Sequence, residues 1–277
     1  MQPDLTSPGV HIVAAWSPIS PISDVKGDNR VAQYNIITGT SMACPHATGA
    51  AAYIKSFHPT WSPAAIKSAL MTTGNAKILF PTFQIMKEVI IMDLSPLCVL
   101  YAATPMSAKK NPQVEFAYGA GNIDPVKAVH PGLVYDANEI DFVNFLCGQG
   151  YTAKALQQVT VDHSVCSKAT NGTVWNLNYP SFALSTFNKE SIVGTFNRSV
   201  TNVGLAVSTY KATIIGAPKG LKIKVKPNIL SFTSIGQKQS FVLKVEGRIV
   251  EDIVSTSLVW DNGVHQVRSP IVVYGVE

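Results

Sequence analysis

The hydrophobic pattern of this chain changes near Tyr179, and that change constrains its fold more than any other feature. From there on apolar and polar residues alternate, as they do in half-buried β-strands. Gly, Pro and Asn-Gly separate the runs, and Asp261-Asn262-Gly263 is a hairpin signal. The expected strands are residues 196–203, 210–215, 221–225, 241–245, 257–260 and 264–273. Several short strands over about a hundred residues predict a β-sandwich.

The segment before this change predicts helices and one strand. Residues 11–16 form a short apolar run, as expected for a buried strand. A segment rich in Ala and Gly follows, which predicts a helix packed closely on all sides with Thr40 as its N-cap. Ser62 caps a second helix, with Pro63 in its first position. The expected fold class is therefore a partial α/β parallel-sheet domain followed by an all-β sandwich.

Short helices alternate with loops between these two parts. Asp124 is expected to cap one helix, and Asn138 another that continues to Gly148. We divide the chain into a first domain (1–133), a connector (134–178) and the β-domain (179–277). We expect the first domain alone to fold poorly, because a parallel sheet without its other strands exposes an unpaired edge.

Charge and hydropathy exclude several functions. Only 14% of the 277 residues are charged and the net charge is +5, so neither charged tails nor coiled coils are expected. The three lysines at 222, 224 and 226 alternate along a strand and suit a solvated edge, so no nucleic-acid partner is expected. The longest apolar stretch, 89–103, is too short and too interrupted to span a membrane. No signal peptide is recognisable at Met1.

The cysteines and two sequons point to a secreted protein. Cys147 and Cys166 are close in sequence and are a candidate disulfide, whereas the spacing of the cysteines fits no metal site. Asn171 and Asn197 begin Asn-x-Ser/Thr sequons and are candidates for N-glycosylation. Because these features occur without a signal peptide, we expect the sequence to be part of a longer protein. Cys44 is interpreted as a small buried core residue rather than a reactive thiol.

The sharpest chemical signal is the string from Gly39 to His46, Gly-Thr-Ser-Met-Ala-Cys-Pro-His. A cap at Thr40 places Ser41 in the first helical turn, where backbone N–H groups are unpaired and the helix dipole is positive. A serine there can attack a carbonyl while its own N–H helps to hold the oxyanion. Pro45 cannot donate to the Ser41 carbonyl, so the start of the helix is expected to be distorted.

This string is similar to the serine signature of subtilisin-like proteases, and Asp4–Val10 resembles the segment that precedes it in those enzymes, with Ser7 in place of the usual alanine. Apart from about residues 74–103, the chain resembles the cucumisin-like group of plant subtilases. The segments that carry this finer resemblance are 34–41, 58–73, 116–121, 131–136, 177–182 and 200–204. The resemblance implies a cell-wall or apoplastic serine endopeptidase acting on proteins or peptides without a cofactor, with a fibronectin type III-like sandwich at its end.

The rest of the catalytic apparatus is not recognisable. The Asp-Ser-Gly or Asp-Thr-Gly motif, the His-Gly-Thr-His motif and the oxyanion Asn of the family have no counterpart here. His46 lies about 140° around the helix from Ser41 and cannot replace the base. Four further histidines, at positions 58, 130, 163 and 265, have no aspartate partner that we can place. They are interpreted as structural or surface residues. We expect this chain alone to be inactive, and the alternative reading is a non-catalytic truncated product or β-sandwich binding module.

One segment does not fit the family. Residues 74–103 are rich in apolar residues, where a surface insertion is normally polar. Without them, Thr73 continues directly into Thr104 with a smooth resemblance on both sides. We interpret the segment as translated non-coding sequence rather than a lineage-specific packed insertion. In that case Cys98 has no native disulfide partner.

Overall fold

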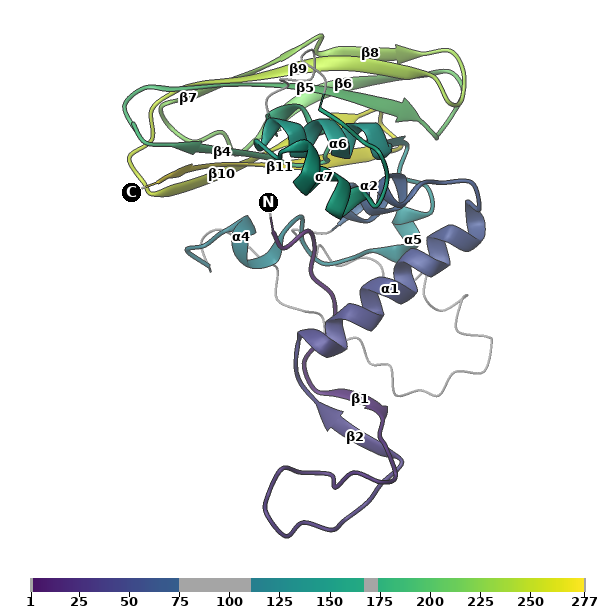
Figure 1. Ribbon diagram of the computed structural model, residues 1–277. Helices are drawn as coiled ribbons and strands as arrows, with labels where there is room; N and C mark the ends of the chain where they lie inside the picture. Colours follow the sequence, from purple (N-terminus) through teal and green to yellow (C-terminus); the bar gives the residue numbers. More distant parts are fainter. Residues whose placement is uncertain (1, 75–110, 167–173, 277) are drawn as a thin grey trace.

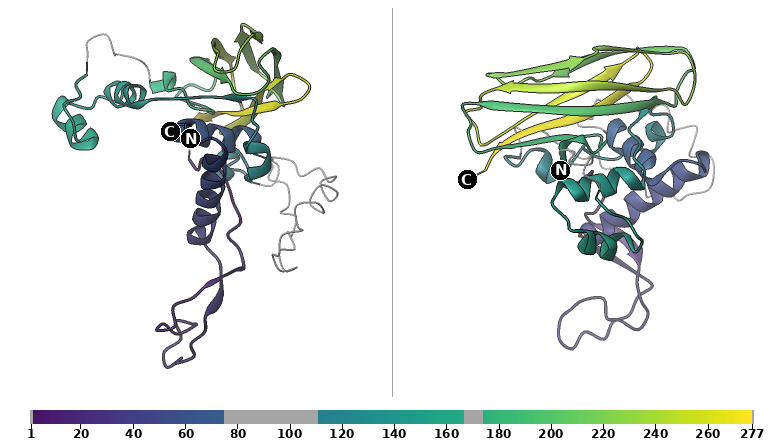
Figure 2. Two further views of the ribbon diagram at one scale, coloured as in Figure 1. Left: turned by 90° about the vertical axis from the view of Figure 1, so that its right-hand side faces the viewer. Right: turned by 45° about the horizontal axis from the view of Figure 1, so that its top comes forward.

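The computed structural model describes residues 2–74, 111–166 and 174–276. Figure 1 shows a β-sandwich at one end of the molecule and helices packed below it. A long helix leads from these helices to a two-stranded arm at the opposite end (Figures 1 and 2). The expected class, an α/β part followed by a fibronectin type III-like domain, is confirmed.

The sandwich consists of a five-stranded and a four-stranded sheet. In spatial order the first contains β4 (Phe182–Thr186), β11 (Gln266–Gly275), β10 (Ile253–Asp261), β6 (Ser208–Ile215) and β8 (Ile229–Phe232). The second contains β3 (Leu133–Val134), β5 (Ile192–Asn202), β9 (Lys238–Gly247) and β7 (Leu221–Lys226). Neighbouring strands are antiparallel, except that β4 runs parallel to β11.

Alternating residues of both sheets fill the space between them. The largest fully buried side chains of this core include Trp260, Tyr210, Phe196 and Phe241. Leu133 and Tyr135, which precede the period-two segment, belong to the same core. The six predicted strands correspond to β5, β6, β7, β9, β10 and β11.

Four of the described helices begin at a residue whose side chain caps them. Ser62 caps α2 (Pro63–Thr73), Asp124 caps α5 (Pro125–Ala128), and Asn138 caps α6 (Glu139–Gly148), as predicted. Thr152 caps a further helix, α7 (Ala153–Thr160), and α4 (Glu115–Tyr118) is a single turn. Side-chain oxygens at these caps accept hydrogen bonds from N–H groups that the first helical turn leaves unpaired.

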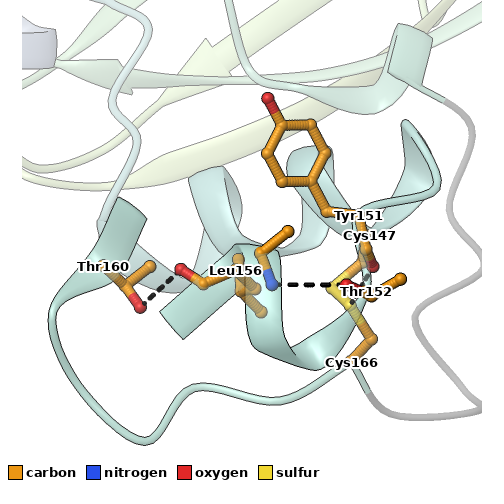
Figure 3. Close-up of a disulfide and its surroundings, with 7 residues drawn as sticks. Cys147, Tyr151, Thr152, Leu156, Thr160 and Cys166 are labelled. Atoms are coloured by element: carbon orange, nitrogen blue, oxygen red, sulfur yellow. Dashed lines mark hydrogen bonds between the residues drawn. A yellow bond between two sulfur atoms is a disulfide. The ribbon is translucent and has the colours of Figure 1, made fainter. Parts of the chain in front are cut away.

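A disulfide joins α6 to the segment after α7. Cys147 and Cys166 are bonded, with their Cα atoms 5.6 Å apart. Figure 3 shows the bond beside the start of α7, where the Leu156 N–H donates to the Thr152 carbonyl at 2.8 Å. Cys98 and Asn171 lie outside the described residues.

Removing this disulfide should destabilise the chain. The sequence separation of 19 residues corresponds to about 3 kcal/mol in the chain-entropy model. Urea unfolding of a Cys147→Ser/Cys166→Ser variant measures the loss, and Cys44→Ser, at a free exposed cysteine, is the control. Equal unfolding free energies for the two variants would contradict the expectation.

The arm consists of β1 (Ile12–Ala15) and β2 (Tyr34–Ile37), which pair antiparallel with Val13 opposite Ile36. One face of the pair carries Val13, Tyr34 and Ile36, with 58%, 65% and 63% of their surfaces exposed. The first domain therefore presents an apolar face to solvent. Of the helices in the described ranges, none is long and apolar enough to cross a bilayer.

Candidate active site

The helix that carries Ser41, α1 (Thr40–Phe57), begins at Thr40 and is preceded by Gly39 as the N-cap. The prediction that Thr40 is the N-cap is therefore wrong. The reason is a backbone contact: the Gly39 N–H donates to the Gly9 carbonyl at 2.8 Å. The Gly39 carbonyl then accepts hydrogen bonds from the N–H groups of Met42 and Ala43, at 3.0 and 3.3 Å. Ser41 still lies in the first turn.

The surroundings of Ser41 suit a nucleophile. Its side chain is exposed, and the N–H groups of Thr40 and Ser41 have no acceptor among the described residues. These N–H groups lie at the positive end of the dipole of an 18-residue helix. Pro45, inside the helix, has no N–H to donate to the Ser41 carbonyl. The helix start can thus stabilise negative charge that develops on a carbonyl oxygen attacked by Ser41.

No base contacts Ser41 in the part of the chain that the structure describes. The Ser41 hydroxyl has no hydrogen-bond partner there. The His46 Nδ1 lies 2.7 Å from the Met42 carbonyl, so it bonds to the backbone of its own helix. The His58 Nε2 lies 2.7 Å from the Val129 carbonyl, and its ring stacks on Trp61. These two histidines have structural contacts instead of a catalytic partner.

The expected close packing around α1 is not observed. Within α1 only Ala50 and Ile54 are buried, and Cys44 is a free, exposed cysteine. The prediction that Cys44 is buried in the core is therefore wrong. The helices α2 and α5 pack against one side of α1 near its C-terminal half, whereas most residues of its N-terminal turns are exposed.

Segment 4–9 holds the start of α1. The Ser7 hydroxyl donates to the Ala43 carbonyl at 2.6 Å, and Ser7 is itself buried. A Cβ at Gly9 would lie 2.9 Å from the Gly39 carbonyl oxygen, so only glycine allows this close approach. Because the N-terminal turns of α1 are otherwise exposed, these contacts fix the position of Ser41.

Segment 4–9 is in turn fixed by residues 118–123. The Ala120 N–H donates to the Asp4 carbonyl, and the Thr6 N–H donates to the Gly121 carbonyl, each at 2.9 Å. Thr6 and Asn122 form an isolated parallel β-bridge between the two segments. Gly119 has φ +61°, and a Cβ there would lie 2.4 Å from the Asp4 carbonyl carbon. The two segments are thus in backbone contact.

The sandwich holds residues 115–120 through a partly buried arginine that faces a buried carboxyl group. Arg268 of β11 donates from Nη1 to the Ala120 carbonyl at 2.8 Å and from Nε to the Ser257 hydroxyl at 3.0 Å. Its Nη2 lies 3.7 Å from Glu115 Oε1, which also accepts from the Ser255 hydroxyl at 3.0 Å. Burial raises the pKa of the Glu115 carboxyl and lowers the pKa of the Arg268 guanidinium. A continuous set of contacts therefore connects the sandwich to the helix of Ser41.

Known families match both parts of the chain. A model described as "Subtilase family" matches residues 1–121, and one described as "Fibronectin type-III domain" matches residues 176–273. The chain belongs to the subtilases.

Two plant relatives match this subtilase chain over its whole length. Subtilisin-like protease SBT4.6 of Arabidopsis thaliana is 45% identical over 280 residues, covering 99% of this chain and 34% of that protein. Subtilisin-like protease SBT4.3 of the same plant is 42% identical, covering 100% of this chain and 34% of that protein. The subtilase chain thus spans about a third of the length of these relatives.

A solved serine protease of Aeromonas sobria aligns with 89% of this chain and 43% of its own, at 12% identity and a TM-score of 0.24.

Sequence reasoning missed the residues that support the nucleophile. Ser7 is conspicuous in the sequence because the family usually has alanine there, but its hydrogen bond to the Ala43 carbonyl could not be anticipated. Arg268 and Glu115 are far apart in the chain, and no motif connects them. Among the described residues, no group of three or more His, Cys, Asp or Glu side chains could hold a metal ion.

Proposed function

We propose that this chain supplies the nucleophile of a subtilisin-like serine endopeptidase. The Ser41 Oγ attacks the carbonyl carbon of a peptide bond, and water then hydrolyses the resulting acyl-enzyme. The observation that carries the proposal is the exposed Ser41 hydroxyl on the first turn of α1, beside two backbone N–H groups without acceptors in the described ranges.

The proposal assigns the base and the acid to residues outside these 277, since the sequence contains neither family motif. The substrates are proteins or peptides, and the reaction needs no cofactor because side chains and backbone N–H groups supply all of its chemistry. An extracellular location is supported by the Cys147–Cys166 disulfide, a bond typical of oxidising compartments. The sequons at Asn171 and Asn197 add to this support.

A second candidate function is a non-catalytic one, in which the chain is a truncated product or a β-sandwich binding module. It is favoured by the Ser41 hydroxyl, which contacts no base in the described part of the chain. The two candidates make opposite predictions once the base and the acid are supplied.

A chimeric protease tests the proposal. This chain replaces the matching third of Subtilisin-like protease SBT4.6, and cleavage of a protein substrate is measured. Ser41→Ala should lower turnover by about 10⁶, as loss of the serine does in subtilisin. The matched control is Ser56→Ala on the same helix, where the hydroxyl donates only to the Tyr53 carbonyl.

The control chimera should keep the activity of the parent. A folded chimera that is inactive, beside an active parent protease, would favour the non-catalytic candidate. If the Ser41→Ala chimera were as active as the unsubstituted one, Ser41 would be excluded as the nucleophile.

A further inference from the structure

The outer face of the four-stranded sheet contains a hollow of about 420 Å³ beside β5. It has no role in the proposed peptidase site. The residues that shape it include Asn176, Asn197, Ser199, Lys226, Ser240 and Val242.

Asn197 and Ser199, the two recognition residues of the second sequon, both line this hollow. Side chains alternate along β5, so Asn197 and Ser199 both face outward while Arg198 faces the interior. Arg198 is only 5% exposed, donates to the Tyr179 carbonyl at 3.0 Å and lies 4.9 Å from the centre of the Phe182 ring. The buried middle residue therefore holds both recognition side chains of the sequon on the accessible face.

The orientation of Asn197 is compatible with a linked sugar. Its Nδ2 donates to the Asn176 Oδ1 at 3.1 Å. An amide nitrogen carries two hydrogens, and N-glycosylation replaces one of them. The other can keep the bond to Asn176, so the modified side chain stays directed along the hollow.

The polar groups around Asn197 are available for a ligand. The Ser199 and Ser240 hydroxyls and the Lys226 ammonium have no hydrogen-bond partner among the residues that the structure describes. Together they offer donors and acceptors that suit sugar hydroxyls. Val242, directly opposite Asn197 in the ladder, adds an apolar spot against which a sugar ring can pack.

We propose that Asn197 carries an N-linked glycan whose first sugars occupy this hollow. In the transfer, the bond between sugar C1 and the diphosphate of a lipid-linked oligosaccharide breaks, and a bond from C1 to Nδ2 forms. The diphosphate leaves, and Nδ2 loses one proton. This inference rests on the proposed extracellular location, because the donor is found in the secretory pathway.

Two variants at Ser199 test the proposal. The full chain is sent into the secretory pathway of a eukaryotic cell with an added leader, so that its natural location does not affect the result. Ser199→Thr keeps the sequon and Ser199→Ala removes it, while Asn197 is intact in both. Mass spectrometry should find the glycan on Asn197 in the wild type and in Ser199→Thr, and none in Ser199→Ala.

Lysine labelling tests whether the sugars lie in the hollow. Lys226 lines the hollow, while Lys222 is exposed on the same strand outside it. Acetylation of Lys226 relative to Lys222 should be several-fold slower in Ser199→Thr than in Ser199→Ala.

An unmodified Asn197 in secreted chain with its disulfide formed would overturn the proposal. A glycan on Asn197 that leaves the Lys226 to Lys222 ratio unchanged would overturn the placement in the hollow. Neither result bears on Ser41, and an inactive chimera would not bear on Asn197.

Discussion

A fluorophosphonate probe should not label Ser41 in the 277-residue chain by itself. The probe reacts with an activated serine, and the Ser41 hydroxyl contacts no base in the described structure. In subtilisin, loss of the histidine alone lowers turnover by about 10⁶, nearly as much as loss of the whole triad. The expected rate of labelling is therefore that of the Ser41→Ala variant, and casein should remain uncleaved.

The comparison of the unsubstituted chain with Ser41→Ala requires that both proteins are folded. Formation of the Cys147–Cys166 disulfide and cooperative unfolding of the sandwich are the two checks of folding. Labelling that Ser41→Ala abolishes would show that a base is present within these 277 residues. In that case the six histidines would have to be reconsidered, beginning with His46, the one on α1 itself.

Replacing Arg268 by Met should weaken the hold of the sandwich on the helix of Ser41. The variant leaves the buried Ala120 carbonyl without its donor and Glu115 without its cation. Losses of this kind together cost about 3 kcal/mol of the free energy of unfolding. Amide hydrogen exchange should accelerate at Ala120 and Thr6, and then at Gly39, whose N–H bonds to the Gly9 carbonyl.

Arg248→Met is the matched control for this prediction. Arg248 lies 3.8 Å from Glu190, but both side chains are largely exposed. Exposed ion pairs contribute little to stability, so the free energy of unfolding and the rates of amide exchange should hardly change in this variant. If Arg268→Met behaves like Arg248→Met, the buried contact is unimportant. If it destabilises the chain but leaves Gly39 protected, the sandwich adds stability without positioning Ser41.

Local signals in the sequence predicted the elements that local physics determines. Ser62, Asp124 and Asn138 cap helices as expected, because an N-cap needs only its own side chain and the next three residues. Strands with long alternation, such as β5 and β9, were also predicted. The short strands β4 and β8 were missed, because four or five residues carry too little alternation to stand out.

The errors concern long-range contacts. Thr40 is not the N-cap because Gly9, thirty residues away, fixes Gly39. Cys44 is exposed because burial depends on which elements cover a helix, and composition alone does not contain that information. The nucleophile was recognisable from its eight-residue string, whereas its supports Ser7 and Arg268 depend on tertiary pairing. Of residues 74–103, the structure describes only Gly74, so the interpretation of this segment as translated non-coding sequence stays a prediction.

The pairing of Thr6 with Asn122 connects the described parts of the chain that precede and follow residues 75–110. Gly74 packs against the backbone of Ala120 and Asn122, and residues 120–123 are hydrogen-bonded to segment 4–9. The described chain on both sides of the interval is therefore anchored. Codons gained or lost between Gly74 and Asn111 therefore need not displace Ser41. For the same reason, two polypeptides produced by a break in that interval should remain associated, with the nucleophile on one piece and the sandwich on the other.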